Sequence, residues 1–167
     1  GAKVNQYPEL ARRIVAEGHE IGAYTFTHAD LDAAPGWRRG PELGLTRIAV
    51  ASATGRTVRL MRPPYSSIPA AVTVDGLGTM RSVAASGYLV VLADRDTGDW
   101  RRPGVDAIVA AANERTGAGG PGAVVLLHDG GGDRSQTVAA VDRLLSTSPG
   151  VRYTTVSAPP NSTVWPP

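Results

Sequence analysis

Two of the three histidines follow apolar runs of strand length and lie close to carboxylates in the sequence. His128 comes directly after residues 124–127, Val-Val-Leu-Leu, so its imidazole lies at the edge of a dry core, where one neighbouring carboxylate can tune its pKa. That position suits a general acid. His28 follows another apolar run. A histidine with a purely structural role is the alternative at each position, but finding both at strand ends favours function.

Carboxylates and a guanidinium gather in two further segments. Residues 94–100 contain Asp94, Asp96 and Asp99, three carboxylates within six residues. This segment is either a solvated turn or part of a site. Arg62 precedes two prolines, which hold the backbone extended, and its planar fork is suited to orienting a carboxylate. A surface arginine before a turn is the other interpretation.

Two glycine-rich stretches are candidates for a nucleotide-binding loop. Residues 117–122 precede a strand, whereas a dinucleotide-binding loop must follow one, so this stretch is excluded. Residues 130–132 lie between a strand and a helix but lack the Gly-Lys-Ser/Thr ending of a phosphate loop. An unrelated nucleotide-binding α/β domain remains an alternative only through this second stretch.

Composition narrows the class of protein. The 167 residues are 42% hydrophobic and 19% charged with a formal net charge of +2, which predicts one folded domain and excludes a disordered chain or a dedicated nucleic-acid binder. The absence of cysteine excludes disulfides and thiolate metal sites. No apolar stretch approaches the roughly 20 residues that span a bilayer.

Apolar runs alternate with helical periodicity along the chain. Strands are predicted over residues 20–27, 57–61, 88–93, 123–127 and 151–156. Helices are predicted over residues 8–17, 45–55, 75–87 and 105–112, and in a last segment capped by Asp133, while residues 29–41 and 94–100 read as loops. The core-facing side chains would include Leu45 and Ile48 in the second helix and Val138 and Leu145 in the last.

This alternation predicts a mostly parallel sheet, open or closed into a barrel, because parallel neighbours need long crossovers. Function in such folds gathers at the C-terminal ends of the strands. We therefore expect the polar clusters to converge on one rim, formed by residues 27–28, 62–67, 94–100 and 128–129.

Four motifs in order carry a family resemblance. They are residues 18–28, Gly-His-Glu-Ile-Gly-Ala-Tyr-Thr-Phe-Thr-His; 62–65, Arg-Pro-Pro-Tyr; 96–100, Asp-Thr-Gly-Asp-Trp; and 126–129, Leu-Leu-His-Asp. Together they resemble the polysaccharide deacetylase family, the NodB-type carbohydrate esterases, with an actinobacterial character. The resemblance covers residues 1–158, with an irregular tail over 159–167.

The resemblance implies a distorted (β/α) barrel that removes acetyl groups from N-acetylated glycans such as peptidoglycan or chitin, outside the cell or at its surface. It also implies zinc or another divalent metal, which polarises the acetyl carbonyl and activates water. The implied partner is the polysaccharide substrate, with neither nucleic acid nor a membrane segment.

The resemblance assigns a role to each motif residue. His128 would be the general acid, Asp99 the carboxylate that tunes its pKa, and Arg62 the residue that orients the catalytic base. Tyr65 would donate its backbone amide to the oxyanion, and Trp100 and Leu126 would line the acetyl pocket. His28 would be a metal ligand.

Two departures from the family pattern change the expectation for this chain. The first family motif, a Thr-Phe-Asp-Asp-Gly-Pro-like segment with the base and one metal ligand, is expected upstream of Gly1, together with the first two strands of the barrel. Tyr24 stands where the family has a histidine, so only His28 remains of three ligands. We expect the chain alone not to hold zinc tightly and to need an N-terminal segment or partner chain. A noncatalytic carbohydrate-binding pseudoenzyme is the alternative.

Overall fold

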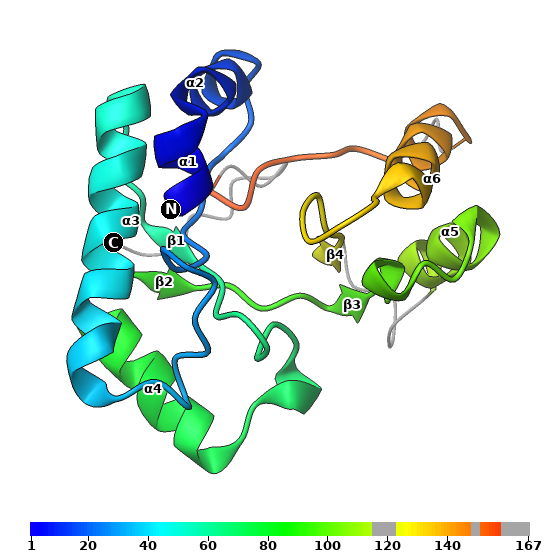
Figure 1. The fold of residues 1–167 in the computed structure, drawn as a ribbon. Helices are drawn as coiled ribbons and strands as arrows, with labels where there is room; N and C mark the ends of the chain where they lie inside the picture. Colours follow the sequence, from blue (N-terminus) through cyan, green and yellow to red (C-terminus); the bar gives the residue numbers. More distant parts are fainter. Residues whose placement is uncertain (115–122, 148–150, 158–167) are drawn as a thin grey trace. The chain divides into compact units, whose positions relative to one another are not determined.

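The computed structural model describes residues 1–114, 123–147 and 151–157, which form two compact units (Figure 1). The first unit contains residues 1–67 and 71–91 together with the described residues from 153 onward, and the second contains 68–70 and 92–152. The glycine-rich stretch 117–122 and the predicted tail 159–167 lie outside the described residues.

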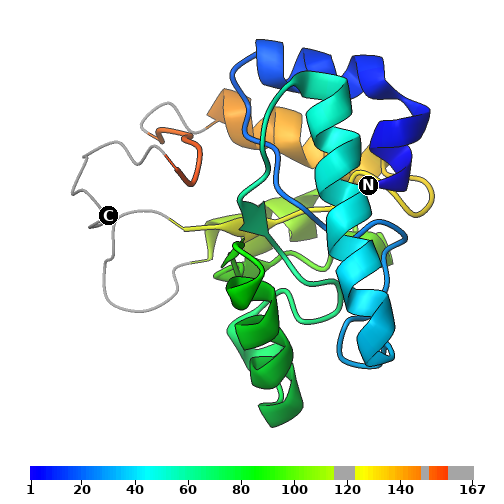
Figure 2. The same cartoon turned by 90° about the vertical axis from the view of Figure 1, so that its left-hand side faces the viewer.

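The first unit combines four helices with one parallel strand pair. Its elements are α1 (Ala2–Gln6), α2 (Pro8–Ala16), α3 (Gly36–Thr54), β1 (Leu60–Met61), α4 (Val74–Ala85) and β2 (Leu89–Val90). Leu60 pairs with Leu89 and Met61 with Val90. α3 packs against α1 and α2, and α4 lies against β2 (Figure 1, Figure 2). A short 3₁₀ helix, η1 (Pro69–Ala71), precedes α4.

Strand pairing in this unit is shorter than the sequence predicts. The predicted strand over residues 20–27 is reduced to a parallel bridge between Ala23 and Met61. The Ala23 amide donates to the Leu60 carbonyl at 2.7 Å, and the Arg62 amide donates to the Ala23 carbonyl at 3.0 Å. Pairing is confined to Ala23, and two residues later, at Thr25, the backbone has left extended geometry, with a φ of +57°.

The core of the first unit is apolar and includes one tyrosine, Tyr88, whose hydroxyl is hydrogen-bonded. Leu31, Val50, Met61 and Val83 are each at most 2% exposed. Tyr88 packs among them, and its hydroxyl donates to the Leu43 carbonyl at 3.0 Å. The buried oxygen therefore has a partner and adds no desolvation penalty.

α3 differs from its prediction in both start and orientation. It begins at Gly36, inside the segment expected to be a loop, and contains Pro41. Leu45 and Ile48 were predicted to face the core but are 46% and 63% exposed. The buried stripe of α3 instead consists of Glu42, Leu43, Thr46, Ala49, Val50 and Ala53. The polar residues Glu42 and Thr46 can be buried in this stripe because their side chains are hydrogen-bonded inside the fold. A pattern of apolar residues cannot predict such positions.

The second unit contains a second parallel pair beneath two helices. Its elements are β3 (Arg95–Asp96), η2 (Asp99–Arg101, a 3₁₀ turn), α5 (Val105–Asn113), β4 (Val125–Leu126) and α6 (Ser135–Thr147). Arg95 pairs with Val125 and Asp96 with Leu126. α5 packs on α6, and Ile108 of α5 and Ala140 of α6 are both fully buried. The parallel pairs and the helices confirm the predicted mixed α/β class.

Three expectations for the second unit and the C-terminal segment were wrong. β3 lies within residues expected to be a loop, because its partner β4 supplies backbone bonds that local sequence cannot show. In α6, Val138 and Leu145 are 68% and 56% exposed, while Thr137, Ala140 and Leu144 face inward. Residues 151–157 contain no strand.

None of the helices in the described part of the chain is long and apolar enough to cross a bilayer.

Replacing Leu31 with alanine should lower the free energy of unfolding by about 2–5 kcal/mol, because it leaves a cavity in a dry core. Leu31 is 1% exposed, whereas Leu10 of α2 is 52% exposed and serves as the matched control, for which we expect a change within about 0.5 kcal/mol. Urea denaturation followed by circular dichroism measures both. Equal losses in the two variants would contradict this assignment of the core.

Candidate active site

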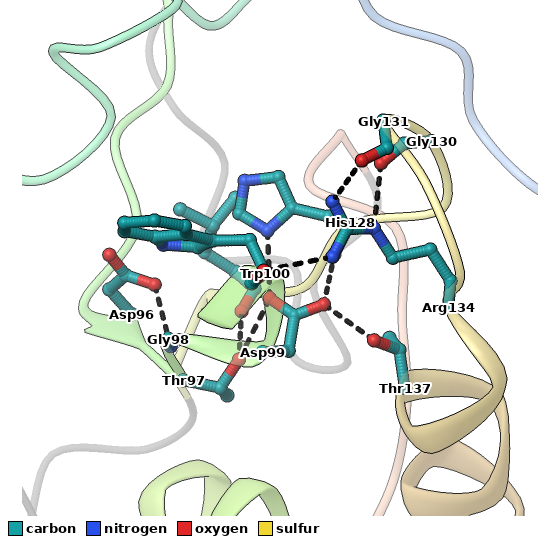
Figure 3. Close-up of polar contacts among 11 residues, drawn as sticks. Asp96, Thr97, Gly98, Asp99, Trp100, His128, Gly130, Gly131, Arg134 and Thr137 are labelled. Carbon is teal, nitrogen blue, oxygen red and sulfur yellow. Dashed lines mark hydrogen bonds and ion pairs between the residues drawn. The ribbon is translucent and has the colours of Figure 1, made fainter. Parts of the chain in front are cut away.

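A buried carboxylate and an imidazole form the best-defined polar contact of the second unit (Figure 3). The side chain of Asp99 is fully buried, and that of His128 is 25% exposed. Oδ1 of Asp99 lies 2.7 Å from Nδ1 of His128, and Oδ2 accepts the His128 backbone amide at 2.8 Å. An ionised carboxylate only accepts hydrogen bonds, so it places a proton on Nδ1 and leaves Nε2 for proton exchange.

The pairing of β3 with β4 brings these two residues together. Asp96 lies opposite Leu126, and the Thr97 hydroxyl continues the contact by donating to the Leu126 carbonyl at 2.9 Å. Gly98 then takes φ +62°, a left-handed conformation that glycine adopts without strain. This turn directs Asp99 back toward His128, two residues beyond the end of β4.

The pKa of Asp99 is lowered in the folded chain. Burial favours the neutral acid, but hydrogen bonds from His128 and from the Thr137 hydroxyl, together with the charge of His128, favour the carboxylate more. The other two carboxylates of the segment have local roles: Asp96 accepts the Gly98 amide at 2.9 Å, and Asp94 accepts the Val124 amide at 2.7 Å. Of the three, only Asp99 contacts a histidine.

Trp100 and Leu126, the predicted acetyl-pocket residues, lie within two residues of this pair in the sequence. Trp100 follows Asp99 and is 47% exposed, while Leu126 is buried in β4. Arg134 donates to the Trp100 carbonyl at 3.2 Å and to the carbonyls of Gly130 and Gly131 at 2.7 and 2.9 Å (Figure 3). One guanidinium therefore fixes the glycine loop and the tryptophan backbone.

In the first unit, His28 lies between two tyrosine rings. Its ring centroid is 5.0 Å from that of Tyr24 and 5.2 Å from that of Tyr65, and both contacts are edge-on. His28 and Tyr65 have φ values of +63° and +64°, which are uncommon for residues other than glycine and cost free energy. The fold holds both residues in strained conformations at this point.

The described residues do not fit a catalytic zinc ion. Within residues 1–114, 123–147 and 151–157, no group of three or more histidine or acidic side chains is placed to hold a metal. Catalytic zinc takes three protein ligands, and here His28 contacts aromatic rings instead. The predicted ligand is therefore present without the partners that would complete its site.

Arg62 is half-buried at the end of β1. Its Nε donates to the Val91 carbonyl at 3.1 Å. Burial lowers the pKa of the guanidinium, and the nearby Tyr24 partly offsets this. Among the residues that the structure describes, no carboxylate forms an ion pair with Arg62.

Sequence reasoning missed Glu42, a buried acid in α3. Its carboxylate accepts the backbone amides of Phe26 and Thr27 at 2.9 and 2.8 Å, the Thr27 hydroxyl at 2.5 Å and Arg38 Nε at 3.2 Å. Burial raises the pKa of Glu42, but these hydrogen bonds lower it by more than burial raises it, so the pKa in the folded chain lies below its usual value. Glu42 thereby fixes the segment leading to His28. The one local feature of the sequence that could have indicated a role for Glu42 is Arg38, four residues earlier, with which it forms an ion pair.

An α/β chain with a buried carboxylate–imidazole pair at the ends of two parallel strands is built for acid–base chemistry. The family model described as polysaccharide deacetylase matches residues 1–78. A chitooligosaccharide deacetylase of Sinorhizobium fredii is 38% identical over 160 residues, covering 87% of this chain and 68% of the relative. The chain belongs to the polysaccharide deacetylase family, which contradicts the alternative of an unrelated nucleotide-binding domain.

Further comparisons agree with this membership. A peptidoglycan-N-acetylglucosamine deacetylase of Bacillus cereus is 34% identical over 161 residues, covering 94% of this chain and 70% of the relative. The family 4 carbohydrate esterase from Streptomyces lividans, solved in complex with acetate, aligns with a TM-score of 0.71 at 32% identity. That alignment covers 88% of this chain and 69% of the esterase. The chain thus spans roughly two thirds of the length of these relatives.

Replacing Glu42 with glutamine should reduce the loss of stability on acidification. A carboxylate whose pKa is lowered by folding stabilises the fold above its unfolded value, near 4.5, and this contribution disappears as the pH falls through the lower folded value. The native chain should therefore lose free energy of unfolding below about pH 5, and the Glu42→Gln curve should be flatter.

Urea denaturation at several pH values measures both curves. Glu17→Gln is the matched control, because Glu17 is exposed on the surface beside Arg13. Parallel curves for the native chain and Glu42→Gln would contradict the prediction.

Proposed function

We propose that this chain contributes the proton-donating half of a deacetylase that hydrolyses N-acetyl groups of glycans such as chitooligosaccharide or peptidoglycan. The observation that carries the proposal is the contact of 2.7 Å between Asp99 and Nδ1 of His128. It leaves Nε2 as the nitrogen that can deliver a proton. The names of the relatives support the substrate class.

Hydrolysis of an N-acetyl group breaks the bond between the acetyl carbon and the sugar nitrogen. As the oxygen of water adds to the carbonyl carbon, the base of the first family motif would take one proton from that water. Protonated His128 would then donate a proton from Nε2 to the nitrogen as the carbon–nitrogen bond breaks, so that the sugar leaves as a neutral amine and the acetyl group as acetic acid, which loses its proton to solvent as acetate. Asp99 stabilises the imidazolium before the transfer and keeps the ring oriented afterwards.

Further residues would orient the substrate. Tyr65 would offer its backbone amide to the oxyanion, and its left-handed conformation supports that role, because strained backbone is typical of functional sites. Trp100 and Leu126 would contact the acetyl methyl group. Arg62 would orient the base, which we place on a segment or partner chain that supplies the first family motif.

The proposal extends to architecture and placement. We propose that this chain and that segment together form the distorted (β/α) barrel of the family, supported by the alignment with the Streptomyces lividans esterase. Placement outside the cell or at its surface is proposed from the substrate class. Metal dependence is expected of the family, but the described residues of this chain do not form the metal site.

A second candidate function is carbohydrate binding without catalysis. The observation that favours it is Tyr24, whose ring contacts His28 where the family resemblance expects a second imidazole. Under this alternative the chain binds glycans but releases no acetate, whichever segment is supplied.

Acetate release from chitooligosaccharide and from peptidoglycan fragments tests the first function. We expect release when the chain is combined with a segment that carries the first family motif. Replacing His128 with alanine should lower the rate about 10²–10⁴-fold, because the general acid is lost. His19→Ala is the matched control, since His19 is exposed. Glycan binding without acetate release, with and without the segment, would support the noncatalytic alternative.

A zinc titration by calorimetry tests the proposed state of the metal site. The chain alone should show no tight binding that depends on His28, so that the native protein and His28→Ala give the same result. Tyr24→His should raise the zinc affinity, because it provides a second imidazole next to the first. Tight zinc binding that disappears in His28→Ala would overturn this expectation.

A further inference from the structure

Thr137 is a buried polar residue on the inward face of α6. It is 5% exposed, and its neighbours on that face, Ala140 and Leu144, are apolar and buried. Its hydroxyl donates to Oδ2 of Asp99 at 2.8 Å (Figure 3). None of the motifs that carry the family resemblance contains Thr137, and the proton transfer proposed above does not use it.

The two oxygens of Asp99 have separate partners. Oδ2 accepts the His128 backbone amide at 2.8 Å and the Thr137 hydroxyl at 2.8 Å, while Oδ1 lies 2.7 Å from the imidazole nitrogen. Two donors on Oδ2 fix the rotation of the carboxylate about its Cβ–Cγ bond. Oδ1 is then held toward His128.

Thr97 does not duplicate this contact. Its hydroxyl lies 2.9 Å from the Leu126 carbonyl and 3.3 Å from Oδ1 of Asp99. A hydroxyl has one proton to donate, and the shorter distance assigns it to the carbonyl. Thr137 is therefore the side-chain hydroxyl that anchors Oδ2.

We propose that Thr137 is a positioning residue that fixes the Asp99 carboxylate and, through it, the tautomer and plane of the His128 imidazole. The proposal rests on the proposed function, in which Nε2 of His128 delivers the proton. α6 thereby contributes to a site whose other members lie at the ends of β3 and β4. A threonine that only filled space could be replaced by valine, which has nearly the same shape, with no effect on the imidazole.

Nitrogen-15 NMR of the histidine rings tests the proposal without requiring turnover. At a pH where the imidazole is neutral, the native chain should show His128 protonated on Nδ1. Thr137→Val should show a mixture of the two tautomers, and Thr137→Ser should restore the native signature, because serine keeps the hydroxyl. Thr147→Val is the matched control: Thr147 lies on the same helix, is exposed and donates to the Arg143 carbonyl.

The acetate-release assay provides the second readout. Thr137→Val should lower kcat about tenfold with KM close to the native value, because it removes one hydrogen bond to a charged group. Thr137→Ser keeps that hydrogen bond and should restore most of kcat. If the valine variant does not fold, Thr137→Ala with Thr137→Ser gives the same comparison.

An unchanged His128 tautomer in the folded valine variant would overturn the proposal, as would a serine variant no better than valine. Absence of acetate release from every variant, the native chain included, would contradict the proposed function alone, because the NMR signature would still report the positioning.

Discussion

The second unit depends on satisfying one buried negative charge. Asp99 is 1% exposed, and an ionised carboxylate at that depth is tolerated only when hydrogen-bond donors replace water. The strongest donors come from the end of β4, through the backbone and ring of His128, and from α6, through Thr137. Since Asp99 itself follows β3, one side chain links three elements. The hydrogen bonds that stabilise this charge also fix the orientation of the His128 ring.

The first unit uses the same physical device at another position. Glu42 is 4% exposed and accepts the backbone amides of Phe26 and Thr27 together with two side-chain donors. Its hydrogen bonds fix the segment that ends at His28, just as those of Asp99 fix His128. In both units a helix or turn supplies the charge, and the amides come from a segment that follows a strand in one unit and an isolated β-bridge in the other. The loops that carry the two histidines are therefore ordered by electrostatics as much as by apolar packing.

The contrast between the two histidines bears on function. His128 has a buried acid as its partner, which suits proton transfer, whereas His28 is exposed and contacts the rings of Tyr24 and Tyr65. The strained backbone at His28 and Tyr65 shows that the fold still imposes a special geometry there. In a family whose relatives are named as deacetylases, this chain has a buried carboxylate–imidazole pair but, among its described residues, no set of three metal ligands.

The α/β class and the approximate place of most helices could be predicted from the sequence, because strand-length apolar runs and glycine turns are local signals. The pairing of Asp99 with His128 is implied by the family resemblance and not by these local signals. The same signals do not predict the orientation of α3 and α6 or the presence of β3. In α3 and α6 the buried positions include Glu42 and Thr137, whose polarity suggests a surface position until their hydrogen-bond partners from distant segments are known. The burial of Asp99, the choice of the oxygen that faces the imidazole and the hydroxyl that holds the other oxygen become known only from the three-dimensional fold, because a buried polar group is stabilised by donors from segments far away in the sequence.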